Sequence, residues 1–110
     1  MGLKFNHMRV IAISTLKIFW EQTDYKDAEI PLRAWLSEVE KANWGSPAEI
    51  KTQFGNASIL KNRRVVFNIK GNDYRIVVAV AYVYQAVYIK FVGPHKQYDE
   101  INALTVELKS

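Results

Sequence analysis

The feature that most constrains the fold is a run of alternating residues on both sides of the dipeptide Gly71-Asn72. Apolar side chains recur there at every second position, which is the period of a β-strand with one buried face. They are Val65, Phe67, Ile69, Tyr74, Ile76, Val78 and Val80. Because Gly-Asn suits a two-residue turn with glycine at a positive φ, the pattern predicts an antiparallel hairpin.

This turn also fixes which residues of the hairpin face each other. Counting outward from it pairs Ile69 with Tyr74 and Asn68 with Arg75. The face opposite the apolar one then carries four polar side chains: Asn68, Lys70, Asp73 and Arg75. The hairpin therefore has one face for a core and one face that is free for chemistry.

A second turn is expected at Tyr84-Gln85, followed by a third strand that ends at Gly93-Pro94. Its register gives three cross-strand pairs: Val80 with Ile89, Val78 with Phe91 and Val77 with Val92. Extended to its end, this register brings the loop containing His95 and Lys96 beside Arg75. A slip of one residue would move these side chains to opposite faces.

The first half of the chain has helical periodicity. We expect a short apolar strand over residues 8–13, then a helix over residues 15–22 with Ser14 as its N-cap. An apolar stripe predicts a second helix over residues 27–43: Leu32, Trp35, Leu36 and Val39. The large aromatic residues of both helices are expected in the core and not on a base-stacking surface: Phe19, Trp20 and Trp35.

Two shorter helices complete the predicted fold. The segment Ser46-Pro47-Ala48-Glu49 has the pattern of a capping box and begins a third helix, which ends near Phe54. The tail from Gln97 onwards is expected to form a short helix. Together the elements predict an α+β fold of two main helices, plus short ones, packed on one face of an antiparallel sheet, in the order β-α-α-(α)-β-β-β with a short C-terminal helix.

Composition excludes several classes of protein. A chain of 110 residues forms one domain; Met8 is a plausible start, so we expect residues 1–7 to be an extension or cloning remnant and residues 8–110 to be the domain. The absence of cysteine excludes disulfides and thiolate catalysis, and neither a phosphate-binding loop nor a metal-ligand spacing is present. We therefore expect no metal and no cofactor. No apolar run approaches the ~20 residues of a membrane span, which predicts a cytoplasmic protein without a membrane partner.

Charge is distributed unevenly along the chain. Residues 61–96 contain seven basic residues and one acid, whereas residues 21–49 contain seven acids and three basic residues. The predicted sheet is therefore basic and the predicted helical layer acidic. A one-sided positive surface favours a polyanion, and RNA fits better than a membrane because no basic amphipathic helix is present.

The polar residues have structural explanations as well as functional ones. The basic run that begins at Lys61 fits a solvated strand edge as well as phosphate contacts. Arg75 is explained by an acidic partner such as Asp73 or Asp99 as well as by catalysis. His95 fits an exposed loop, and Tyr98 a core edge, as well as proton transfer. The pattern alone indicates a small basic domain that binds nucleic acid and does not establish an enzyme.

Three stretches resemble the HigB-type toxins of the RelE superfamily. They are VVFNIKGNDYRIVVAV (residues 65–80), YIKFVGPHKQYDEI (residues 88–101) and, for the helical half, residues 19–54. The resemblance implies the toxin of a type II toxin-antitoxin module, an endoribonuclease that cleaves translated mRNA on the ribosome. It also implies neutralisation by a HigA-type helix-turn-helix antitoxin, with DNA contacted only through that antitoxin.

By position, the resemblance implies Asn68, Arg75, His95 and Tyr98 as catalytic residues. The expected reaction is metal-independent attack by the substrate's own 2′-hydroxyl, with Arg75 stabilising charge and His95 transferring protons. The basic residues would bind the RNA backbone or ribosomal RNA: Lys61, Arg63, Arg64, Lys70 and Lys96. The alternative is a non-catalytic RNA-binding or regulatory module on the same scaffold.

Overall fold

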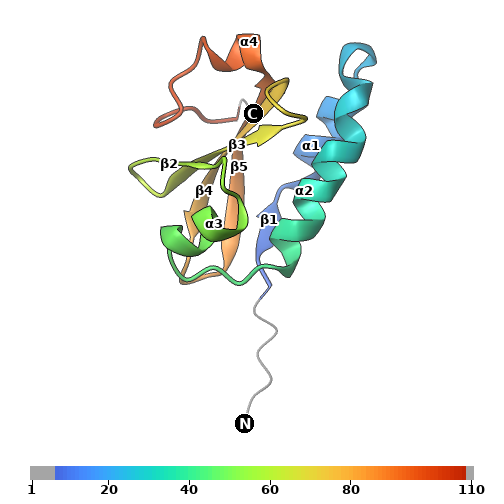
Figure 1. Ribbon diagram of the computed structural model, residues 1–110. Helices are drawn as coiled ribbons and strands as arrows, with labels where there is room; N and C mark the ends of the chain where they lie inside the picture. Colours follow the sequence, from blue (N-terminus) through green and yellow to red (C-terminus); the bar gives the residue numbers. More distant parts are fainter. Residues whose placement is uncertain (1–6, 109–110) are drawn as a thin grey trace.

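The computed structural model describes residues 7–108, and its α+β architecture confirms the predicted fold class. Five strands form one sheet in the order β1-β5-β4-β3-β2. Helices α1 and α2 lie on one side of this sheet, and the C-terminal segment, residues 99–108, lies on the other (Figure 1). Residues 1–6, which belong to the expected N-terminal extension, lie outside the described residues.

The elements occur along the chain in the following order. They are β1 (Arg9–Ile11), α1 (Ile13–Trp20), the 3-10 helix η1 (Thr23–Ala28), α2 (Glu29–Lys41), α3 (Pro47–Gln53), β2 (Ser58–Ile59), β3 (Arg64–Ile69), β4 (Tyr74–Ala81), β5 (Ala86–Pro94) and α4 (His95–Tyr98). Within residues 7–108, none of the helices combines the length and the apolar character needed to cross a bilayer.

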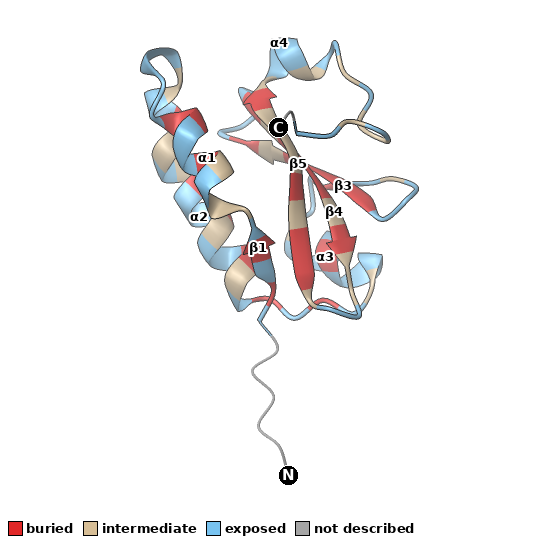
Figure 2. Ribbon diagram, turned by 180° about the vertical axis from the view of Figure 1, so that it is seen from behind, coloured by how far each residue is buried: buried red, intermediate tan, exposed pale blue. Residues whose placement is uncertain are grey.

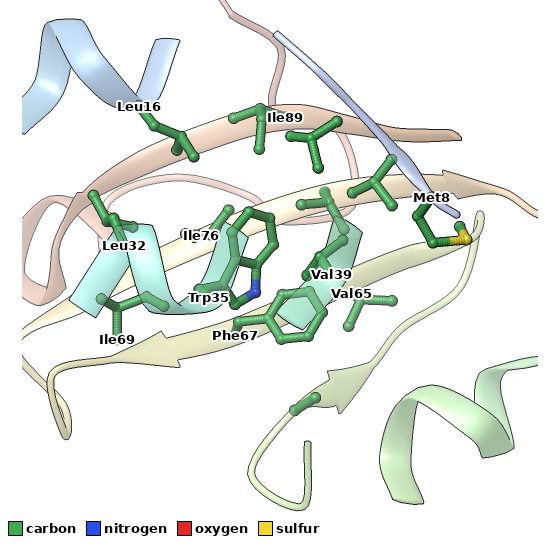
Figure 3. Close-up of a cluster of buried hydrophobic side chains, with 14 of the residues drawn as sticks. Met8, Leu16, Leu32, Trp35, Val39, Val65, Phe67, Ile69, Ile76 and Ile89 are labelled. Atoms are coloured by element: carbon green, nitrogen blue, oxygen red, sulfur yellow. The ribbon is translucent and has the colours of Figure 1, made fainter. Parts of the chain in front are cut away.

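The apolar face of the first hairpin is buried against the helices, as the alternation predicts. All seven alternating residues of β3 and β4 are at most 6% exposed, and buried stretches run along β3, β4 and β5 (Figure 2). Phe67 lies at the centre of this core, with its ring centroid 5.4 Å from that of Trp35 and 5.0 Å from that of Phe54 (Figure 3). Phe19 and Trp20 are also buried, which confirms that these aromatics belong to the core.

The first hairpin has the predicted register, because its turn chemistry determines it. Ile69 faces Tyr74 and Asn68 faces Arg75. Gly71 adopts a φ of +64°, a conformation in which glycine has no steric penalty. Lys70 also adopts a positive φ, of 53°, which its side-chain type does not signal.

The predicted register of the second hairpin is wrong. The turn occupies residues 82–85, so that Val80 faces Val87 and Val78 faces Ile89. A β-bulge then shifts the pairing so that Val77 faces Phe91, which leaves Lys90 without a partner on β4. A bulge reverses the side of the sheet to which the following side chains point. Phe91 therefore lies on the face opposite the helices.

Three other expectations are corrected. The sheet is mixed, because β1 pairs with β5 in parallel, and the short strand β2 adds a further edge. Helix α1 begins at Ile13 with Ala12 as N-cap, so Ser14 lies inside the first turn and caps nothing. The C-terminal helix starts at His95 instead of Gln97, because the extended backbone of Pro94 serves as its N-cap. It ends after one turn, at Tyr98.

Candidate active site

Arg75 of β4 and Tyr98 of α4 meet on the face of the sheet opposite the helices. The guanidinium carbon of Arg75 lies 5.6 Å from the centroid of the Tyr98 ring, a cation–π distance. Nη1 of Arg75 donates to the carbonyl of Asn72 at 2.9 Å and to that of Tyr74 at 3.3 Å. Within residues 7–108, Arg75 has no carboxylate in ion-pair distance, so the expected acidic partner is not found and donors remain for an external anion.

His95 begins α4, and its backbone is tied to the turn that precedes Arg75. The His95 N–H donates to the carbonyl of Asp73 at 2.9 Å. The ring Nδ1 lies 3.5 Å from Oδ2 of Asp99, and the side chain is half-exposed. Asp99 therefore lies beside His95 and not beside Arg75. With the carboxylate on the Nδ1 side of the ring, Nε2 remains available to exchange a proton with a substrate.

Asn68 lies directly across the sheet from Arg75. The two residues are partners in the β3–β4 register, and Asn68 is half-buried. Asn68 borders a small crevice together with Gln53 and Glu38. The structure thus places Asn68, Arg75 and the start of α4 at the same end of the sheet.

The predicted RNA-contact residues fall into different environments. Lys61, Arg63 and Lys96 are exposed. Lys61 and Arg63, however, precede β3, which begins at Arg64. Asn68 lies four residue steps further along this strand, a distance of about 13 Å. These two basic residues therefore lie at the other end of β3 from Arg75.

Lys70 is also exposed, but it is paired with two acids of the same chain. Its Nζ lies 3.2 Å from Oδ2 of Asp27 and 3.1 Å from Oδ2 of Asp73, and these two acids raise the pKa of Lys70. Hydrogen bonds from the Tyr74 hydroxyl and from Lys70 lower the pKa of Asp27. Burial, together with the bond to Asp27, raises the pKa of Tyr74 to about 12. This cluster joins η1 to the hairpin turn.

Arg64 is buried, which removes it from the residues that can touch an external RNA. It is 7% exposed, and its guanidinium donates to the carbonyl of Val106 at 2.7 Å and to Oε2 of Glu107 at 2.8 Å. Lys90 donates to the other oxygen of the same carboxylate at 2.7 Å. Since Glu107 and the Asp27 cluster engage three of the seven basic residues, the basic surface is smaller than the sequence implied.

Phe91 and Gly93 complete the environment of Tyr98, and the sequence did not single them out. The centroids of the Phe91 and Tyr98 rings lie 6.3 Å apart. Gly93 is the β5 partner of Arg75, and a Cβ added to it would lie 2.7 Å from Cζ of Phe91. Only glycine therefore lets the Phe91 ring lie against the strand beneath Tyr98. The sequence feature that could have pointed to this tight contact is the Gly93-Pro94 pair at the end of β5.

Comparison with known proteins gives the family of the chain. A family model described as "HigB_toxin, RelE-like toxic component of a toxin-antitoxin system" matches residues 28–101, which include Asn68, Arg75, His95 and Tyr98. The chain belongs to the HigB toxin family. Within this family, the mRNA interferase toxin HigB of Escherichia coli K12 is 30% identical over 99 residues, covering 88% of this chain and 93% of that protein.

Two further HigB relatives agree with the assignment. The mRNA interferase HigB of Shigella flexneri is likewise 30% identical over 99 residues, with the same shares of both chains covered. The mRNA interferase HigB of Escherichia coli O6:H1 is 23% identical over 79 residues, covering 70% of this chain and 77% of that protein. These matches extend over both the helical layer and the sheet, and the α+β fold described above is that of a RelE-like HigB toxin.

Proposed function

We propose that this HigB-family chain is an mRNA endoribonuclease that acts on ribosome-bound, translated mRNA and so inhibits growth. The observation that carries the proposal is the contact between Arg75 and Tyr98, in which the guanidinium carbon lies 5.6 Å from the centroid of the phenol ring. The one-turn helix that carries Tyr98 also carries the imidazole of His95. The relatives named as mRNA interferases support the choice of substrate.

The proposed reaction is transesterification by the RNA itself, without a metal ion. The 2′-oxygen attacks the adjacent phosphorus, the bond to the 5′-oxygen breaks, and a 2′,3′-cyclic phosphate and a 5′-hydroxyl are formed. The protein must accept the 2′-proton, stabilise the extra negative charge and protonate the 5′-oxygen. These are tasks for general acid–base groups and for a fixed cation.

The side chains at this end of the sheet suit these tasks. Arg75 stays protonated and its planar fork can bind two phosphate oxygens, so it stabilises the phosphorane. His95, oriented by Asp99, transfers a proton, and Tyr98 positions the guanidinium or donates the second proton. Asn68, opposite Arg75, orients the phosphate or the base. Lys96 and, further away, Lys61 and Arg63 bind the RNA backbone or ribosomal RNA.

Membership of a toxin-antitoxin family implies an antitoxin partner. We propose a HigA-like helix-turn-helix protein, so that this chain contacts DNA only through it. Co-expression with such a protein is expected to restore growth to cells that produce the toxin.

A reconstituted translation reaction tests the proposal. The purified chain is added to ribosomes that translate a defined mRNA, and the new 5′ ends are mapped. We expect cleavage within codons, its loss when the nucleotide at the cut carries a 2′-deoxyribose, and cyclic phosphate at the product ends. RNA that is bound but never cut would favour a non-catalytic RNA-binding module. Cleavage that survives the 2′-deoxy substitution would refute the proposed reaction.

A further inference from the structure

Arg64 is the one buried charged side chain within residues 7–108, and the proposed reaction does not use it. A buried guanidinium is stable only when its donors are satisfied, and its loss leaves the accepting groups without partners. What Arg64 binds is therefore informative. All of its hydrogen-bond acceptors lie in the C-terminal segment: the carbonyls of Ala103 and Val106 and the carboxylate of Glu107.

The C-terminal segment has no regular secondary structure to hold it in place. It contains a compact turn around Asn102, whose side-chain oxygen accepts from the N–H of Leu104 at 2.9 Å and whose carbonyl accepts from the N–H of Val106 at 2.8 Å. These bonds shape the turn internally and do not attach it to the sheet. Arg64, together with Lys90, provides the attachment through Val106 and Glu107.

Apolar packing leaves the segment incompletely fixed. A groove of about 550 Å³ lies between the segment and α1, and it is lined by Ile101, Val106 and Leu108 on one side and by Ile18 on the other. Side chains that border an open groove have few partners to immobilise them. On this side of the segment, the contacts of Arg64 with Val106 and Glu107 supply the fixed attachment that the groove does not.

The segment continues directly from α4, which carries His95 and Tyr98. Helix α4 is one turn long, and a single turn is not stable by itself. Its start is held by the bond from His95 N–H to the carbonyl of Asp73, and its end continues through Ile101, whose N–H donates to the carbonyl of Tyr98 at 3.2 Å. A displacement of the C-terminal segment that reaches Ile101 thus acts on Tyr98, three residues earlier.

We propose that Arg64 is a positioning residue for the active site: by anchoring Val106 and Glu107 to β3, it keeps Tyr98 against Arg75 and His95 at the edge of the sheet. The inference rests on the proposed endoribonuclease function. It separates Arg64 from its neighbour Arg63, which is exposed and belongs to the proposed RNA-contact residues. Two adjacent arginines then serve one reaction in different ways.

The test compares Arg64→Met, Arg64→Lys and Arg63→Met in the full chain, with Arg33→Met on α2 as the neutral control. We expect Arg64→Met to lower kcat by on the order of tenfold to a hundredfold with KM nearly unchanged, because reacting groups that move by about 1 Å lose that much. Arg64→Lys retains the charge without the fork and should recover part of kcat. Arg63→Met should instead raise KM and weaken its dependence on salt.

Amide hydrogen exchange gives a readout that needs no RNA. Arg64→Met should speed exchange at residues 95–108 and leave the amides of β3 and β4 protected. Should Arg64→Met fail to fold, Glu107→Gln tests the same anchor at an exposed position, with faster exchange and a smaller loss of kcat. Unchanged exchange, or faster exchange with unchanged kcat, would overturn the inference. An unmodified chain that does not cleave RNA would instead refute the proposed function, and the exchange data would still decide whether Arg64 anchors the segment.

Discussion

The two faces of the central sheet are built from the same strands but differ in what covers them. Along β3 and β4, the face toward α1 and α2 carries apolar side chains and Tyr74, all nearly inaccessible to solvent. The opposite face carries Arg64, Asn68 and Arg75, and an irregular C-terminal segment covers part of it. The first face stabilises the fold, and the second holds the candidate active site. Substitutions on the two faces should therefore separate stability from activity.

The largest expected effect is that of Arg75→Ala on the face that carries the site. Loss of the guanidinium should reduce mRNA cleavage by on the order of a hundredfold to a thousandfold and abolish growth inhibition. Stability should change little, because the half-buried side chain bonds only to two carbonyls beside it. The measurement is product mapping in the translation reaction, with thermal unfolding as a check and Arg33→Ala as control. A folded Arg75→Ala variant with full toxicity would eliminate the proposed role.

A pair of phenylalanines tests the comparison most directly. Phe67→Ala, in the helix-covered core, should lower the free energy of unfolding by about 3–5 kcal/mol, the usual cost of emptying a buried aromatic site. Phe91→Ala, on the other face, should cost clearly less stability, because Phe91 is only partly buried, yet it should reduce cleavage by loosening Tyr98. Urea denaturation and the cleavage assay measure both. If Phe67→Ala and Phe91→Ala lowered the free energy of unfolding equally, the division between a stabilising face and an active-site face would be wrong.

Gly93→Ala should affect the site by a smaller amount. The new methyl group would lie 2.7 Å from Cζ of Phe91, so the ring must shift and Tyr98 with it. We expect cleavage to fall by about tenfold and stability by about 1 kcal/mol, as for mild overpacking. Gly55→Ala is the matched control, because a Cβ there meets nothing within 4 Å. A Gly93→Ala variant as active as the control would contradict the tight contact.

The smallest expected effect is a pH dependence at the C-terminal segment. The hydrogen bond from Lys90, with Arg64 acting in the same direction, holds the pKa of Glu107 below its usual value of 4.5. A depressed pKa contributes stability above pH 4.5, and this contribution disappears as the pH falls through the lower folded-state value. Protection of the amides of residues 103–107, taken as the intrinsic exchange rate at each pH divided by the measured rate, should therefore decrease between pH 5 and pH 3 in the unmodified chain. Glu107→Gln should show low protection at both pH values, and an equal loss of protection in both proteins would rule out Glu107 as the cause.

The features of the fold that the sequence predicted are those set by local chemistry. The Gly71 turn determines the first hairpin, so the Asn68–Arg75 pair and the apolar face followed by counting. The β-bulge, in which Lys90 is the extra residue of β5, has no comparable signal in the sequence. A lysine at this position looks like any exposed residue of a strand. The parallel pairing of β1 with β5 joins the two ends of the domain, and no local preference specifies it.

The candidate site shows the same division. The approach of α4 to Arg75 was anticipated from the hairpins, and it survived an incorrect register because the bulge partly offset the error at the turn. Arg64 was misplaced among the RNA contacts for a physical reason. A basic residue at the start of a strand has the same sequence pattern whether it is solvated or buried, and its partner Glu107 lies 43 residues later.

The order of the elements along the chain has a consequence for biosynthesis. Both main helices precede four of the five strands of the sheet that they cover, and the four residues assigned to catalysis all follow position 67. A nascent polypeptide leaves the ribosome from its N-terminus, so α1 and α2 emerge with no sheet to pack against. Any product of premature termination before β5 lacks a complete hydrophobic core and His95 as well. The proposed activity therefore cannot arise before the codons of β5 and α4 have been translated.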